Sequence, residues 1–196
     1  MNLVKKVKIE FGKRSTFTIN DLRRVLGRNI NDGYIYLLVH NLLASGEMKR
    51  IAKGVYTFKD ELELVGFGFA PFYYGLQEAL SLRNMWEQET IPIILTTKKV
   101  RPGSRKFSGN NYLIRHINRK MFFGFEMIKY HDFWIPVSDM EKTLIDFIYF
   151  KEPIQDEVLV EMKIRKDVLE QYLKRCPTWV KIRTNSRLNN LNVSKK

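Results

Sequence analysis

Thr16–Phe58 reads TFTINDLRRVLGRNINDGYIYLLVHNLLASGEMKRIAKGVYTF. A short β-like segment opens it and is followed by Asn20 and Asp21, whose side chains can cap a helix. Apolar residues of that helix recur on one face, and Gly27 supplies its end. The first part of the stretch therefore predicts a short strand and an amphipathic helix.

A longer helix is predicted from about residue 33 to residue 44, with Asn31 and Asp32 as its capping residues. Its apolar side chains follow the i, i+3, i+4, i+7, i+8 spacing of a core-facing stripe: Ile35, Leu38, Val39, Leu42 and Leu43. The remaining side chains define a second face, which we expect to be exposed: Tyr34, Tyr36, Leu37, His40 and Asn41.

Two short strands follow at about 47–51 and 55–58, joined by a tight turn at which Gly54 permits a positive φ. Helix, turn, helix and hairpin in this order predict a winged helix-turn-helix, whose second helix enters the DNA major groove. The alternative is a small α+β core with a surface hairpin. Basic residues favour DNA binding, because they flank the turn and crowd the hairpin: Arg23, Arg24, Arg28, Lys49, Arg50 and Lys53.

The predicted DNA-binding residues fall into two groups. The exposed helix face supplies candidates for base edges, with Asn41 the best reader because an amide can bond adenine bidentately. The hairpin cations are expected to contact phosphates. The full set is Arg28, Asn31, Tyr34, Tyr36, Leu37, His40, Asn41, Lys49, Arg50 and Lys53.

The net charge of +13 is distributed in blocks along the chain of 196 residues. Residues 1–58, 98–120 and 163–196 are basic, whereas residues 59–97 and 121–162 are acidic. Basic surface attracts phosphate backbones through counterion release. With one cysteine, no apolar run long enough for a membrane span and no signal peptide, a cytoplasmic protein is expected.

Charge and composition shift near residue 60, which predicts a winged-helix domain at 1–60 and an α+β domain at 61–176 with a mixed or antiparallel sheet. We expect a helix from Pro71 to about residue 86, strands at 90–97 and 112–117, and a hairpin at 121–137. Helices are expected at 140–150, 156–162 and 165–176, the first with Ser138 and Glu141 as a capping box. Residues 177–196 are polar and basic and predict a flexible tail.

Residues 98–120 form a second basic segment, expected to lie in part on an exposed loop. Its cations are Lys98, Lys99, Arg101, Arg105, Lys106, Arg115, Arg119 and Lys120. A solvated loop is one interpretation. The other is a surface for DNA backbone or RNA, where interleaved aromatic residues would suit single strands.

With these residues placed, the chain resembles the AbiEi family of antitoxins from type IV toxin–antitoxin systems. The segment LASGEMKRIAKGVY at 43–56 is similar to the family's "L…G.l.ri.rGvY" pattern, and IPVSDMEKTLID at 135–146 resembles its "i.va.pEkalvDll" helix. The helix EALSL at 78–82 and the strand IILT at 93–96 complete the likeness, which covers most of residues 10–175. The basic 98–120 segment and the tyrosine-rich helix depart from the family pattern, so no operator sequence can be carried over.

The resemblance implies a transcriptional autorepressor that binds an inverted repeat in its own promoter, as a homodimer or as cooperating monomers. It also implies a functional partner, a nucleotidyltransferase toxin, which the second domain neutralises with or without direct contact. We expect no cofactor, no metal and no membrane contact.

Catalysis finds little support in the sequence. Glu161 and Lys163 have the E-x-K form of metal-dependent nucleases, with Asp132, Asp139 or Asp146 as possible further acids. Such pairs are frequent by chance in charged helices, and Asp146 is interpreted more simply as an exposed helix flank. The three histidines lack metal-ligand spacing. We therefore predict that the protein is not an enzyme and has no catalytic residue.

Overall fold

The structure, a computed structural model, describes residues 3–27 and 29–193. It divides the chain into two compact units, the first containing Met1–Ala70 with Lys106–Asn111 and the second containing Pro71–Arg105 with Tyr112–Lys196. Helices and a mixed sheet occur together, so the predicted α+β class is confirmed. The boundary lies at Ala70, ten residues beyond the predicted one.

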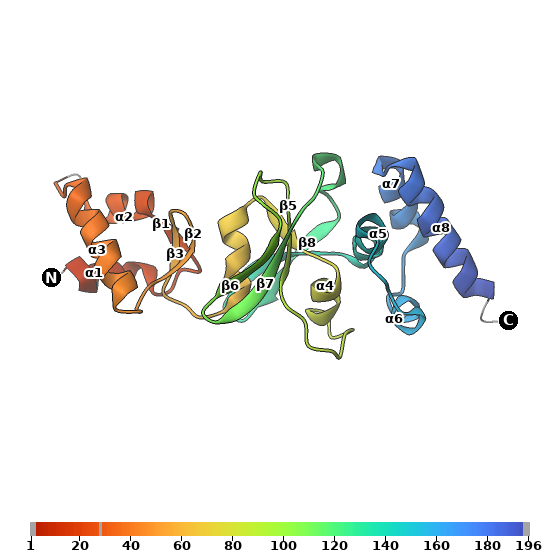
Figure 1. Ribbon diagram of the computed structural model, residues 1–196, viewed down its shortest axis with the longest axis horizontal. Coiled ribbons are helices and arrows are strands. Elements are labelled where there is room, and N and C mark those ends of the chain that lie inside the picture. Colours follow the sequence, from red (N-terminus) through yellow and green to blue (C-terminus); the bar gives the residue numbers. More distant parts are fainter. Residues whose placement is uncertain (1–2, 28, 194–196) are drawn as a thin grey trace. The chain divides into compact units, whose positions relative to one another are not determined.

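The first unit begins with three helices around one apolar core (Figure 1). These are α1 (Leu3–Phe11), α2 (Ile19–Leu26) and α3 (Asp32–Ala44). Thr18 caps α2: its hydroxyl accepts from the Asp21 amide, and the Asp21 carboxylate accepts from the Thr18 amide, a reciprocal capping box. The cap therefore lies two residues before the predicted one.

A small antiparallel sheet completes this unit, with strand order β1-β3-β2. Its strands are β1 (Phe17–Thr18), β2 (Lys49–Ala52) and β3 (Val55–Thr57), and Gly54 adopts a positive φ of 80° in the turn. The 3₁₀ segment η1 (Leu62–Phe69) packs against β2.

A mixed six-stranded sheet in the order β6-β7-β5-β4-β9-β8 belongs mainly to the second unit, and Lys106–Asn111 of its β6–β7 hairpin are grouped with the first. Its strands are β4 (Phe72–Tyr74), β5 (Ile93–Thr96), β6 (Gly103–Phe107), β7 (Asn110–His116), β8 (Phe125–Tyr130) and β9 (Phe133–Ser138). The β4–β9 and β5–β7 pairs are parallel, while β4–β5 and β8–β9 are antiparallel. The predicted 121–137 hairpin is present, with its turn between Tyr130 and Phe133.

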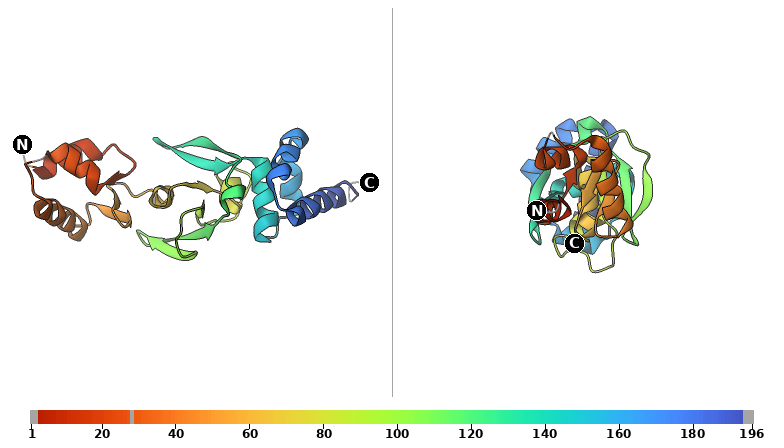
Figure 2. Two further views of the ribbon diagram at one scale, coloured as in Figure 1. Left: turned by 90° about the horizontal axis from the view of Figure 1, so that it is seen from above. Right: turned by 90° about the vertical axis from the view of Figure 1, so that its left-hand side faces the viewer.

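Four helices lie together on one side of this sheet, as Figure 1 and Figure 2 both show: α5 (Met140–Phe150), α6 (Asp156–Glu161), α7 (Lys166–Arg175) and α8 (Thr178–Val193). The shorter elements are α4 (Gln77–Ser81) and the 3₁₀ turn η2 (Arg119–Met121). A single apolar core joins side chains of the central strands to α5, α7 and α8.

The prediction of a helix from Pro71 to residue 86 is wrong for its first half. Phe72–Tyr74 instead form β4, because all three aromatic side chains are buried between sheet neighbours. Leu76 then takes a positive φ of 58°, which interrupts any helix, and only Gln77–Ser81 are helical.

The flexible tail predicted at 177–196 is also wrong for residues 178–193, which form α8. Val180 and Thr184 are fully buried on this helix, and Leu191 joins the core of the unit. These three buried positions are four and seven residues apart, and one of them is a threonine, so the sequence of the segment looked too polar to pack. Within the basic segment 98–120, the expected exposed loop ends at residue 102, and β6 begins at Gly103.

Candidate nucleic-acid interface

The helix α3 presents two chemically different faces, as its sequence predicts. Ile35, Leu38, Val39 and Leu42 are buried in the core of the first unit, and Leu43 is half-buried against it. Every residue of the predicted base-reading set is exposed, including Tyr36 at 52% and Leu37 at 54%. These two side chains lie among the polar residues Tyr34, His40 and Asn41.

The N-terminus of α3 is held by Asn31, whose side-chain oxygen accepts a 2.8 Å hydrogen bond from the Tyr34 amide. This assigns Asn31 a capping role that fixes where the helix begins. Arg23 of α2 donates to both carboxylate oxygens of Asp32, at 2.8 and 2.9 Å, which ties α2 to the start of α3. Arg28 lies outside the described residues.

The hairpin β2–β3 carries its three cations in different settings. Arg50 and Lys53 are exposed, and Lys53 lies at the turn next to Gly54. Lys49 is only 25% exposed and forms an ion pair with Asp60, so its charge is already partly compensated. Arg50 and Lys53 are therefore better placed than Lys49 to meet a phosphate.

The second basic segment is not one continuous patch. Arg115 is bound to Glu152 and its guanidinium lies 5.3 Å from the centre of the Phe150 ring. Arg105 on β6 donates to the carbonyl oxygen of Arg101 at 2.9 Å. Lys106 lies in the 106–111 segment, which groups with the first unit.

Four cations of this segment do line hollows on the second unit. Lys98, Lys99 and Arg119 surround an open hollow of about 510 Å³. Lys120, the next residue of η2, lines a separate hollow of about 300 Å³ together with Arg175. The turn η2 thus places consecutive basic residues in two neighbouring concavities.

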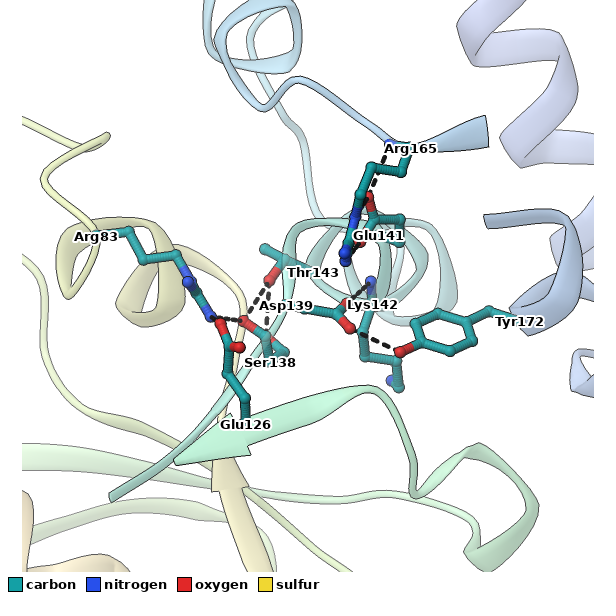
Figure 3. A network of polar contacts seen from close by, with 9 residues as sticks. All are labelled: Arg83, Glu126, Ser138, Asp139, Glu141, Lys142, Thr143, Arg165 and Tyr172. Atoms are coloured by element: carbon teal, nitrogen blue, oxygen red, sulfur yellow. Dashed lines mark hydrogen bonds and ion pairs between the residues drawn. The ribbon is translucent and has the colours of Figure 1, made fainter. Parts of the chain in front are cut away.

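One of the acids weighed for a nuclease site has a structural role that Figure 3 shows. Asp139 is the N-cap of α5 and accepts from the Lys142 amide at 2.8 Å and from the Tyr172 hydroxyl at 2.7 Å. Burial raises the pKa of Asp139. Burial and the hydrogen bond to Asp139 raise the pKa of Tyr172 to about 12. The predicted capping box of Ser138 and Glu141 is therefore wrong.

Glu141 points instead to the loop before α7 and is 1% exposed. It accepts three hydrogen bonds from Arg165, one from the backbone amide at 2.7 Å and two from the guanidinium at 3.0 and 2.8 Å. Burial alone would raise the pKa of Glu141, but these bonds outweigh it and hold the pKa below its usual value.

Asp146, predicted to be exposed, is fully buried. Its carboxylate forms an ion pair with the buried ammonium of Lys142 and accepts a 3.0 Å hydrogen bond from the Tyr73 hydroxyl. Lys142 also donates to that hydroxyl at 2.8 Å. Glu161 and Lys163 are exposed, and among the described residues no three His, Cys, Asp or Glu side chains converge as metal ligands would.

One exposed surface of the second unit escaped the sequence-based interpretation. Met127 on β8 and Trp134 on β9 are 54% and 55% exposed, and they lie on the same face of the hairpin. The alternation of Phe133, Ile135 and Val137 with Trp134 along β9 was the sequence signal that could have placed Trp134 on the opposite face.

A scan against protein-family models found no match, and a search of the curated proteins found none either. None of the helices in the described ranges is long and apolar enough to cross a membrane.

Proposed function

We propose that this protein is a sequence-specific DNA-binding transcriptional regulator whose first unit acts as a winged helix-turn-helix. The main support for the proposal is that α3 exposes five potential base-reading side chains on one face and buries its apolar residues on the opposite face. In such motifs the second helix enters the major groove and the hairpin contacts the flanking backbone.

The exposed residues divide by the contact they can make. Asn41 can bond an adenine bidentately, while Tyr34, Tyr36, Leu37 and His40 offer hydroxyl, ring and apolar contacts to base edges and thymine methyl groups. Arg50 and Lys53 on the hairpin can neutralise phosphates without reading sequence. Asn31 contributes by setting the start of α3.

We further propose that the regulator is the antitoxin and autorepressor of a type IV toxin–antitoxin system, acting in the cytoplasm without a cofactor. The likeness of residues 43–56 and 135–146 to AbiEi motifs supports this. In this proposal an inverted repeat in its own promoter is bound by a homodimer or by cooperating monomers, and a nucleotidyltransferase toxin is the functional partner. Incubation of DNA with the protein and Mg²⁺ or Mn²⁺ should leave it uncut.

A mobility-shift assay on the DNA upstream of the chain's own coding sequence tests the regulatory part. The native protein should shift this duplex in the presence of excess random duplex. A shift that random duplex abolishes at equal concentration would contradict sequence-specific binding.

Co-expression with a nucleotidyltransferase encoded by the neighbouring reading frame tests the antitoxin part. The full chain should restore growth that the transferase alone stops. Toxicity that persists at high levels of the folded chain would contradict this role and would leave the DNA-binding proposal unaffected.

A further inference from the structure

The basic hollow on the second unit combines charge with an aromatic wall. Lys98, Lys99 and Arg119 line it together with Phe122, Pro71 and Thr97, and its volume of about 510 Å³ is in the range of small-ligand sites. Three cations around one concavity favour a ligand with phosphate groups. The half-buried ring of Phe122 adds a surface on which a planar group can stack.

The aromatic surface continues from this hollow onto strand β8. The Phe122 and Phe125 ring centroids are 5.0 Å apart, and Phe125 is 37% exposed. Met127 follows two residues later and therefore lies on the same face of the strand. Figure 2 shows the β8–β9 hairpin reaching away from α5. Met127 on this hairpin is 54% exposed.

The neighbouring strand extends the same face. Directly opposed residues of an antiparallel pair share one side of the sheet, and Lys129 is opposed to Trp134. The two other positions of β9 on this side, Pro136 and Ser138, are buried, so Trp134 is the exposed contribution of β9. Glu126 lies on the reverse face, where Arg83 binds it at 2.7 Å (Figure 3).

We propose that this surface, formed by the basic hollow and the exposed face of Phe125, Met127, Lys129 and Trp134, binds a single-stranded polynucleotide. The hollow takes phosphates, and the bases stack on Phe125 and Trp134 with Lys129 beside them. Single-strand sites combine a basic groove with aromatic platforms in this way. A duplex cannot supply such bases because they are paired and stacked inside the helix.

Charge complementarity distinguishes this occupant from a protein partner. Cations lie at both ends of the apolar surface, Lys98, Lys99 and Arg119 at one end and Lys129 at the other. A polynucleotide strand supplies both phosphates for these cations and bases for the aromatic side chains between them. The site is separate from α3, so it does not depend on the proposed reading of duplex DNA.

Fluorescence anisotropy with labelled oligo(U) and oligo(dT) of about 15 nucleotides tests the proposal on the full chain. Trp134→Ala should weaken binding by about tenfold, while the dependence of log Kd on log salt keeps its slope. Lys99→Ala should flatten that slope by about 0.7, since one phosphate contact is lost. Trp134→Phe keeps a ring and should bind within about threefold of the native protein.

Two matched variants control for general effects of exposed side chains. Ile182→Ala removes an exposed apolar side chain of α8, and Lys174→Ala removes an exposed cation of α7. Both should bind oligo(U) as the native chain does. Asn41→Ala in the first unit should also leave single-strand binding unchanged, which separates this site from the proposed duplex site.

Tighter binding of oligo(U) than of oligo(dT) would identify RNA as the ligand, and the reverse would identify single-stranded DNA. The proposal is overturned if neither oligonucleotide binds, if random duplex of equal length binds as tightly, or if Trp134→Ala and Lys99→Ala bind like the controls. It is also overturned if the native chain binds neither strand and forms a dimer that Trp134→Ala dissociates, since the face would then be a protein interface.

Discussion

Lys142 and Asp146 are both fully buried, one turn apart on α5, with the hydroxyl of Tyr73 bonded to each. Burial lowers the pKa of Lys142 and raises the pKa of Asp146, because each charge has lost its water. Their mutual contact offsets that cost. Removing one partner of such a buried pair lowers the free energy of unfolding strongly, whereas replacing all its polar groups by apolar ones changes it little.

Replacing one member of the pair should therefore destabilise the second unit strongly. Asp146→Asn leaves a buried ammonium without its counter-charge and should cost about 3–5 kcal/mol. Lys142→Met with Asp146→Leu and Tyr73→Phe removes all three polar groups together and should be nearly neutral. Tryptophan fluorescence monitored during urea unfolding measures the change in the free energy of unfolding of the second unit, because all three tryptophans lie in that unit. A cost below about 1 kcal/mol for the single variant would contradict the account.

Glu141 and Arg165 connect α5 to the segment before α7, and their contact predicts an acid-sensitive stability. The folded pKa of Glu141 lies below its usual value of 4.5. Its ionised form therefore contributes stability above that value, and the contribution is lost as the pH falls through the folded pKa. The free-energy difference between the native protein and Glu141→Gln should shrink as the pH is lowered from 7 to about 3.

Unfolding in urea at several pH values measures this difference. Glu170→Gln, an exposed position on α7, serves as the control and should follow the native curve. A difference for Glu141→Gln that stays constant over this range would show that the carboxylate charge does not stabilise the fold.

At the scale of elements, the position of the hairpin depends on a close approach to η1. A Cβ at Gly68 would lie 2.8 Å from the side chains of both Ala52 and Ile51. Gly68→Ala should therefore push η1 away from β2 and cost about 1–3 kcal/mol. Thermal unfolding by circular dichroism should show the loss, and adding Ala52→Gly should recover part of it. An unchanged melting temperature would indicate that the contact is not tight.

Elements with strong local signals could be predicted from the sequence. The apolar stripe and cap of α3 predicted its buried face, and the run from Met140 to Phe150 predicted α5 with the observed bounds. Local capping and periodicity decide such helices.

Elements that depend on distant partners could not be predicted in this way. β4 forms only because β5 and β9 pair with it, and α8 is held by a core contributed from α5 and α7. Asp146 was predicted to be exposed because its hydrogen-bond partner Tyr73 is distant in the sequence, and no local pattern indicates that contact. The hollow formed by Lys98, Lys99 and Arg119 brings together residues some 20 positions apart, and composition predicted its charge but not its shape.

At the scale of the whole molecule, the proposals give each unit its own nucleic-acid surface. The first unit offers an exposed helix face and a basic hairpin, and the second offers a basic hollow with an aromatic strand face. The alternating charge blocks of the sequence fit this separation, since residues 59–97 are acidic between two basic blocks. Variants in one unit should leave the ligand of the other unaffected, so binding to duplex and to single strands can be measured separately on one protein.

The most direct test of the central claim is a salt-dependent titration of Asn41→Ala and Lys53→Ala against the upstream duplex and a random duplex. Asn41→Ala should lose about 1–3 kcal/mol on the upstream duplex only. Lys53→Ala should weaken binding to both duplexes equally and reduce the salt slope by about 1. Equal losses for the two variants on both duplexes would contradict the assignment of α3 as the helix that reads sequence.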